Sequence, residues 1–182
     1  MISNNNGGIG DGGGLFSDSI GSITGSTISG NFADSGGGLR NDGMLTIQNS
    51  TISGNMTTGG QPYGGGIYGR TGSTTTIESS TITNNTGYGG GIYAGDSTTL
   101  NLKNTIIAGN SDPFNGTADL TGAGTVNSNG NNILGDTFGS SGLTNGVNGD
   151  IVGGETSVTV TNATNAAPIQ VTANSHGLAT CL

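Results

Sequence analysis

The chain of 182 residues has few of the side chains from which most protein cores are built. Tryptophan is absent, aromatic residues make up 4% of the chain and hydrophobic residues 30%. We therefore do not expect a compact globular core, because too few large side chains exist to fill one. No run of about 18 apolar residues occurs, so the sequence holds no candidate for a membrane-spanning helix.

Positive charge is also scarce. Lysine and arginine number three (Arg40, Arg70 and Lys103) against eleven acidic residues, which gives a formal net charge of −8. Nucleic-acid binding requires a basic surface that displaces counterions from phosphates, and an anionic membrane surface attracts the same kind of charge. We expect neither nucleic acid as a partner nor membrane insertion of this segment.

Cysteine and histidine occur once each, as Cys181 and His176. A lone cysteine cannot form an internal disulfide, and one histidine with one cysteine argues against a transition-metal site. No signal peptide is visible after Met1, because neither a basic start nor an apolar segment follows it.

Glycine, by contrast, is abundant, with 39 residues, and it marks an internal repeat. Triple glycine followed by an aliphatic residue begins at Gly12, Gly36, Gly64 and Gly89, at spacings of 24, 28 and 25 residues. A second block follows each triplet and reads Ser-Thr-Ile-Ser-Gly-Asn at residues 26–31 and 50–55, with variants at 80–85 and 105–110. Since Met1 is followed by the tail of this block, we expect the chain to be a fragment of a longer array.

Aliphatic residues recur in three columns along these repeats. The columns are Leu15, Leu39, Ile67 and Ile92; Ile23, Ile47, Ile77 and Leu102; and Ile28, Ile52, Ile82 and Ile107. Apolar and polar residues alternate between the columns, which is the period of strands, and no helical period is present. The repeat predicts an all-β fold, a single-stranded parallel β-helix of about five to six coils with a short β-rich C-terminal tail.

Two kinds of turn residue are expected to support the coils. Asn31, Asn55, Asn85 and Asn110 share one turn position, where stacked amides can bond in a ladder and where asparagine tolerates a left-handed backbone. The glycine triplets are expected to give another corner its positive φ angles. The longer third repeat places a surface loop at residues 57–63.

These blocks resemble the right-handed β-helix repeats of bacterial surface proteins in the pectin-lyase-like superfamily, and most closely the polymorphic outer-membrane protein repeats. The resemblance implies a right-handed winding over residues 1–154, with repeats to about 116 and a closing module at 117–154. Residues 155–182 alternate as strands do and resemble the start of a truncated β-rich module. We expect this tail to pack on the last coil or to be poorly ordered.

The resemblance also implies an enzymatic alternative, a polysaccharide lyase or a glycoside hydrolase. Lyases of this fold need a basic proton abstractor, for which Arg40 and Arg70 are candidates, and hydrolases use clustered aspartates. The carboxylates of the repeats, such as Asp34 and Asp42, follow ordinary turn patterns instead. Arg40 and Arg70 are better interpreted as exposed turn residues that aid solubility. His176 lies in the tail without partners. We therefore predict no catalytic residues.

No cofactor is expected, although calcium is considered at two places. Residues 7–11 resemble a calcium-binding glycine-rich nonapeptide with its aspartate, Asp11, one place early. Four aspartates could also offer oxygens to Ca²⁺ near the C-terminal end; they are Asp112, Asp119, Asp136 and Asp150.

Two outward surfaces suggest binding functions. Tyr63, Tyr68, Tyr88 and Tyr93 cluster on the third and fourth coils, and the equivalent positions of Tyr68 and Tyr93 predict an aromatic stack on which sugar rings could lie. Thr27, Thr51 and Thr81 stack as in some ice-binding β-helices, but the column breaks at Ile106.

The sequence thus predicts a non-catalytic structural or adhesive segment of a larger bacterial extracellular or cell-surface protein. Its expected partners are surface glycans or other surface proteins. The alternatives are a carbohydrate-active β-helix and a self-assembling fibre or ice-binding solenoid, in which the strand edges of the first coil would join another copy end to end.

Overall fold

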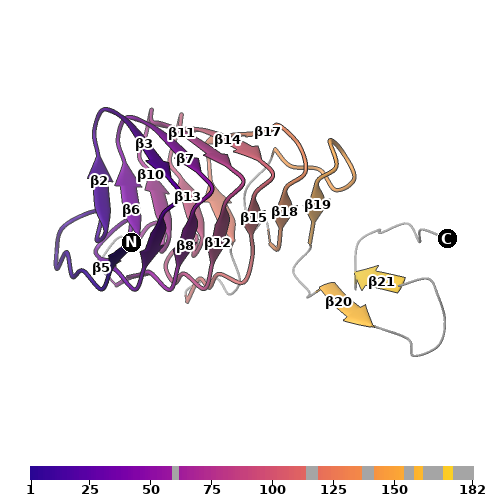
Figure 1. Cartoon of the computed structure of the whole chain (residues 1–182), viewed down its shortest axis with the longest axis horizontal. Coiled ribbons are helices and arrows are strands. Elements are labelled where there is room, and N and C mark those ends of the chain that lie inside the picture. Colours follow the sequence, from indigo (N-terminus) through magenta and orange to yellow (C-terminus); the bar gives the residue numbers. More distant parts are fainter. Residues whose placement is uncertain (59–61, 114–118, 137–141, 154–157, 162–169, 174–182) are drawn as a thin grey trace.

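The chain forms a stack of parallel strands that winds into an elongated solenoid (Figure 1). A computed structural model describes residues 1–58, 62–113, 119–136 and 142–153, together with the backbone of two strands at 158–161 and 170–173. Every named element is a strand, and the described residues include no helix that could cross a membrane. The predicted all-β class is confirmed.

Three parallel sheets form the sides of the solenoid, and two of them contain one strand from each of five turns. Sheet 1 contains β1 (Ile2–Ser3), β4 (Thr27–Ser29), β8 (Thr51–Ser53), β12 (Thr81–Thr83), β15 (Ile106–Ile107), β18 (Ile133–Leu134) and β19 (Ile151–Val152). Sheet 2 contains β2 (Leu15–Ser17), β6 (Leu39–Asn41), β10 (Ile67–Gly69), β13 (Ile92–Ala94) and β16 (Leu120–Gly122). Sheet 3 contains β3 (Ile20–Thr24), β7 (Met44–Gln48), β11 (Thr74–Glu78), β14 (Thr99–Lys103) and β17 (Thr125–Ser128). The parallel solenoid and its number of coils are confirmed, and its right-handed winding stays a prediction.

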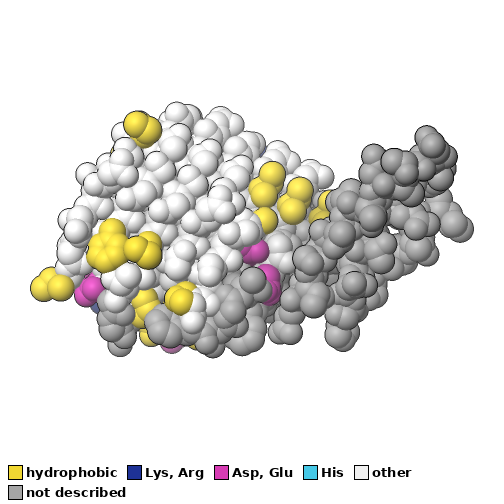
Figure 2. Space-filling model, turned by 90° about the horizontal axis from the view of Figure 1, so that it is seen from below, with side chains coloured by type: hydrophobic (Ala, Val, Ile, Leu, Met, Phe, Trp, Pro, Cys, Tyr) yellow, Lys and Arg dark blue, Asp and Glu magenta, His cyan; other side chains and the backbone are white. Residues whose placement is uncertain are grey.

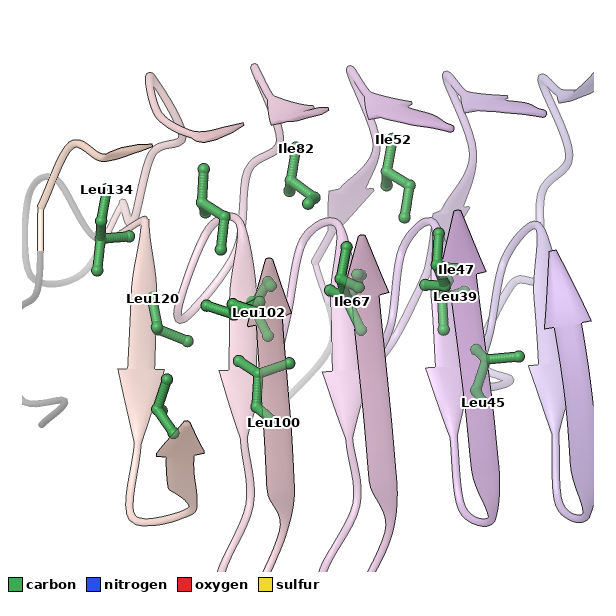
Figure 3. Packing of buried hydrophobic residues seen from close by; sticks show 14 of the residues in the cluster. Leu39, Leu45, Ile47, Ile52, Ile67, Ile82, Leu100, Leu102, Leu120 and Leu134 are labelled. Atoms are coloured by element: carbon green, nitrogen blue, oxygen red, sulfur yellow. The ribbon is translucent and has the colours of Figure 1, made fainter. Parts of the chain in front are cut away.

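The interior is filled by the predicted aliphatic columns, one residue per turn, which lie in register on neighbouring strands. Ile28, Ile52, Ile82 and Ile107 pair along sheet 1 and are 0–1% exposed. Side chains from all three sheets point into the narrow space between them (Figure 3). Since each sheet supplies a polar face to the outside and an aliphatic face to the inside, the period-2 pattern of the sequence has a direct structural cause.

The predicted asparagine ladder is present beside this core. The amide oxygen of Asn55 accepts from the backbone N–H of Asn31 at 2.9 Å and from its side-chain amide at 3.0 Å. The same pair of bonds connects Asn55 to Asn85 and Asn85 to Asn110, and Asn5 extends the ladder at the first turn. Each asparagine therefore satisfies a buried backbone donor on the turn before it.

The left-handed backbone at this corner lies one residue earlier than expected. None of the four ladder asparagines has a positive φ; the residues before them, Gly30, Gly54, Asn84 and Gly109, have φ angles of 55–72°. The prediction that the ladder residues adopt this conformation is wrong. The preceding residue makes the bend, and the asparagine is left to form the ladder.

Glycine triplets make the corner before sheet 2, as predicted, but only their first members have positive φ: Gly12, Gly36, Gly64 and Gly89. A Cβ on the third member Gly38 would lie 2.6 Å from the oxygen of Gly66 and 2.9 Å from the amide nitrogen of Asn55. The remaining glycines therefore allow two turns to approach closely around the asparagine ladder.

The segment resembling a closing module supplies a further rung. Its strands β16, β17, β18 and β19 join the three sheets in register with the repeats before them. Beyond it, β20 (Val158–Thr161) and β21 (Gln170–Ala173) pair antiparallel, so the tail forms strands as expected. Its packing on the last coil stays a prediction.

Candidate functional site

One column of outward side chains on sheet 2 consists of aromatic residues and an arginine. The strand register brings Phe16, Arg40, Tyr68 and Tyr93 side by side on four successive turns. Their inward neighbours are the aliphatic residues of the core, so strand alternation fixes these four side chains on the outside. Tyr68 and Tyr93 pair in register as predicted, but the prediction that their rings stack is wrong: the two rings are tilted by 59°, and it is the ring of Tyr63 that stacks on Tyr93.

Tyr63 and Tyr88 join this column, so that all four tyrosines of the chain form one cluster. Tyr63 is its centre, with ring centroids 5.5 Å from Tyr68, 5.7 Å from Tyr88 and 4.4 Å from Tyr93. Tyr68 and Tyr93 lie 5.8 Å apart, and all four side chains are half-buried. We call Phe16, Arg40 and the four tyrosines the platform.

The longer third repeat places Tyr63 in the cluster. The hydroxyl of Thr57 donates to the carbonyl oxygen of Pro62 at 2.7 Å, and the backbone N–H of Tyr88 donates to the same oxygen at 2.8 Å. Tyr63 then bridges to Tyr88 in parallel register. The end of the predicted loop is thus tied to two turns, whereas residues 59–61 lie outside the described part of the chain.

Arg40 continues the platform between two aromatic rings. The centre of its guanidinium lies 5.5 Å from the Phe16 ring centroid and 5.6 Å from that of Tyr68. Its Nε and one Nη bond both oxygens of Asp42 at 2.6 and 2.8 Å, and its other Nη bonds Asp11. The interpretation of Arg40 as an exposed turn residue is wrong: its side chain is only 13% exposed, because two aromatic rings and two carboxylates lie around the guanidinium.

These contacts fix the charges of the site. The hydrogen bond to Asp42 raises the pKa of Arg40 despite partial burial. Burial works to raise the pKa of Asp42, but hydrogen bonds from Arg40 and Arg70 outweigh it and the pKa is lowered. Burial also raises the pKa of Tyr68 and of Tyr93, so both phenols are protonated at neutral pH and can donate hydrogen bonds.

The aspartates considered for calcium have other surroundings. Asp11 pairs with Arg40, and the Asp119 and Asp150 carboxylates accept hydrogen bonds from ladder asparagines. Among the described residues, no group of three or more acidic, histidine or cysteine side chains is placed to hold a metal ion. The expected gathering of four aspartates around calcium is therefore not found.

The remaining candidates fall into two groups. The threonine column on sheet 1 is present from Thr27 to Thr81 and continues into Ile106 and Ile133, which are each 40% exposed, as the sequence predicted for the break. His176 and Cys181 lie outside the described residues.

Sequence reasoning identified the tyrosines but not the contributions of Phe16 and Arg40. The signal was present, because each of these residues directly follows the column aliphatic after a glycine triplet, as Tyr68 and Tyr93 do. The column was missed because this repeat position holds phenylalanine, arginine and tyrosine rather than one residue type.

Comparison with known proteins adds no relative. No family model, no curated protein and no solved structure matches the chain.

Proposed function

We propose that the chain is a non-catalytic, adhesive β-helical segment of a larger bacterial extracellular or cell-surface protein, and that its platform binds surface glycans. One observation carries the proposal: every tyrosine of an aromatic-poor chain lies in a single partly exposed cluster that continues through Arg40 to Phe16. Aromatic rings with polar tips are well suited to sugars, because the ring contacts C–H groups while the hydroxyl bonds sugar oxygens. The bacterial surface location rests on the resemblance of the repeats.

The state of the charged groups favours binding over catalysis. A lyase base has to release its proton near neutral pH, whereas the pKa of Arg40 is shifted upward by its hydrogen bond to Asp42. A hydrolase needs two accessible carboxyl groups on either side of a glycosidic bond. Asp42 is bound to two arginines, and Asp119 and Asp136 are 3% and 6% exposed.

The proposal predicts that binding depends on Tyr68 and Tyr93. The double substitution Tyr68→Ala and Tyr93→Ala is expected to weaken binding to a glycan panel by about tenfold or more, since each ring contributes stacking contact of roughly 1 kcal/mol. The matched control is Thr74→Ala with Thr99→Ala, an outward pair in register on the same two turns of sheet 3. Titration calorimetry measures the affinities with the protein and the glycan both in solution.

Two results would contradict this function. One is the absence of binding to any glycan of the panel by the unaltered chain. The other is equal loss of binding in the tyrosine pair and in the threonine pair, which would show a general effect on the solenoid rather than contact at the platform. Turnover of any polysaccharide would contradict the non-catalytic part.

A further inference from the structure

The charged groups around the platform neutralise one another. Both carboxylate oxygens of Asp42 accept hydrogen bonds from Arg40, and one of them also pairs with Arg70 at 3.1 Å. Asp11 pairs with the remaining Nη of Arg40. Two cations and two anions therefore occupy one small surface. The raised pKa of Arg40 and the lowered pKa of Asp42 keep this pair ionised over a wide pH range.

Beyond this set, the chain has little charge to offer an anionic ligand. The third basic residue, Lys103, lies on sheet 3, and the net charge of the whole chain is −8. Figure 2 shows one face of the solenoid that is mostly polar and uncharged, with acidic side chains in small groups. A polyanion approaching the molecule would thus be repelled at long range and would find Arg40 and Arg70 already paired with carboxylates.

The platform instead offers partly exposed aromatic rings, tilted against one another, and neutral hydrogen-bonding groups at a regular interval. Its column contributes one planar group per turn, and turns of a parallel sheet are about 4.8 Å apart. The length of one sugar in an extended chain is of the same order, so successive sugars would meet Phe16, Arg40, Tyr68 and Tyr93 in turn. The guanidinium has N–H groups left on both Nη atoms after its three bonds to aspartate, and sugar hydroxyl oxygens can accept from them.

From this balance of charges, and resting on the proposed glycan-binding function, we infer that the platform selects uncharged polysaccharide chains that lie along the solenoid axis across about four turns. Selectivity arises because the charges of a carboxylated or sulfated chain would find no free cation at the platform and would stay unpaired. A neutral chain carries no charge that needs such a partner. The ion pairs act as a fixed neutral rung rather than as an anion-binding site.

The test uses matched ligands on the full chain. The probes are β-1,4-linked mannose oligomers and β-1,4-linked mannuronate oligomers of two to six sugars, and galacturonan in its free and fully methyl-esterified forms. Within each pair the linkage and the ring are the same, and the members differ only in the group at C6, which is charged in one and neutral in the other. The inference expects at least tenfold preference for the neutral member, affinity that rises with length up to about four sugars, and little dependence on salt between 50 and 500 mM, roughly the range over which charge-driven binding weakens strongly.

A charge variant sharpens the test. Asp42→Asn removes one negative charge from between two arginines, so relative affinity for the anionic probe is expected to rise about tenfold. Glu78→Gln on sheet 3 makes the same charge change away from the platform and is expected to leave the preference unchanged.

The outcomes separate the inference from the function on which it rests. Binding that requires Tyr68 and Tyr93 but favours the anionic probes, with steep loss in salt, would overturn the neutral-chain inference and retain the glycan-binding function. Binding to neither member of any pair, or binding unaffected by the tyrosine substitutions, would overturn both.

Discussion

A single aspartate ends the asparagine ladder. Asp119 occupies the position of the third glycine, since Leu120 pairs with Ile92 of the turn before. Its Oδ1 accepts from the backbone N–H of Asn110 at 2.7 Å and from the side-chain amide at 2.8 Å. A carboxylate accepts hydrogen bonds without donating, so it satisfies the last asparagine and requires no further rung.

A second ladder of polar side chains, which includes Ser50, Ser80 and Asn132, also ends in an aspartate. Hydroxyl and amide oxygens of Ser50, Ser80 and Asn132 accept from the preceding turns, and the Asp150 Oδ1 accepts from Asn132 at 2.8 and 3.0 Å. The other Asp150 oxygen is buried and has no hydrogen-bond partner within the described structure. Two buried carboxyl groups therefore mark the end of the regular repeats.

Asp119 should make stability depend on pH. Burial is the largest influence and raises the pKa of Asp119 above its ordinary value of 3.8, with the neighbouring Asp136 adding to it. The folded state then holds the proton more tightly than the unfolded state, so this group stabilises the fold most at low pH and the benefit is lost as pH rises through the folded pKa. The free energy of unfolding of Asp119→Asn, relative to the unaltered chain, should thus shift in favour of the variant between about pH 3 and pH 7.

Urea denaturation at a series of pH values measures this difference. The comparison is insensitive to any constant cost of the substitution, because only the change with pH is read. Asp18→Asn makes the same substitution at an exposed residue and serves as the control. A shift of the Asp119 difference in the opposite direction would contradict the raised pKa.

At this scale the sequence was informative where a residue type recurred. Asn31, Asn55 and Asn85 were predicted as a ladder because identical amides at a fixed spacing have one obvious use. The role of Asp119 was not predicted, because it follows a break in the period and its position depends on which strand lies beside it. The left-handed backbone was misplaced because the residue before the ladder is not of one type: it is glycine on three turns and Asn84 on the other.

At the scale of the element, each glycine triplet combines two separate requirements. Its first member supplies the left-handed turn, as Gly36 does with a φ of 63°. Its second member faces backbone, since a Cβ on Gly37 would lie 2.5 Å from the oxygen of Met56. The third lies against the asparagine amide, so the ladder and the triplet form one corner from two parts of the repeat.

Gly38→Ala is therefore expected to destabilise the solenoid by about 1–3 kcal/mol, the usual cost of forcing atoms into a packed interior. Its added methyl group would meet a backbone oxygen and the Asn55 amide, neither of which can move without breaking ladder bonds. Gly21→Ala is the matched control: its Cβ would meet only Leu45 Cδ1 at 3.3 Å and Ser17 Oγ at 3.4 Å, both ends of side chains. For the control, chemical denaturation should show a change in the free energy of unfolding within about 0.5 kcal/mol. Equal effects of the two substitutions would contradict the role of the third glycine in packing the corner.

Elements were predictable where aliphatic columns define strands, and less so where a turn is extended. The columns on sheets 1, 2 and 3 appear in the structure with the register read from the sequence. Residues 57–63 of the third repeat were predicted as a surface loop, but the attachment of its end depends on the Pro62 carbonyl oxygen and the Tyr63 ring, which both meet Tyr88 of the next turn. No local pattern identifies such partners.

For the whole molecule, stability depends on contacts between adjacent turns. Ile77 shows this, since it pairs with Ile47 of the previous turn and Leu102 of the next and is 0% exposed. Among the described strands of the solenoid, those of distant turns do not pair, so each turn is supported only by its neighbours. Interior turns have two such interfaces and the first turn has one within this chain.

Position along the stack should therefore decide the cost of an identical substitution. Ile77→Ala is expected to lower the free energy of unfolding by about 2–4 kcal/mol, because a cavity forms between two packed turns. Ile23→Ala, in the same column on the first turn, should cost markedly less, since Ile23 is half-buried and has a paired strand on one side only.

Chemical denaturation measures the loss of unfolding free energy for both variants, and amide hydrogen exchange shows which strands lose protection. For Ile77→Ala, protection should fall in β7 and β14 as well as in β11, whereas for Ile23→Ala the loss should stay near β3. Equal costs, or a loss confined to β11, would show that the turns are not coupled through nearest neighbours.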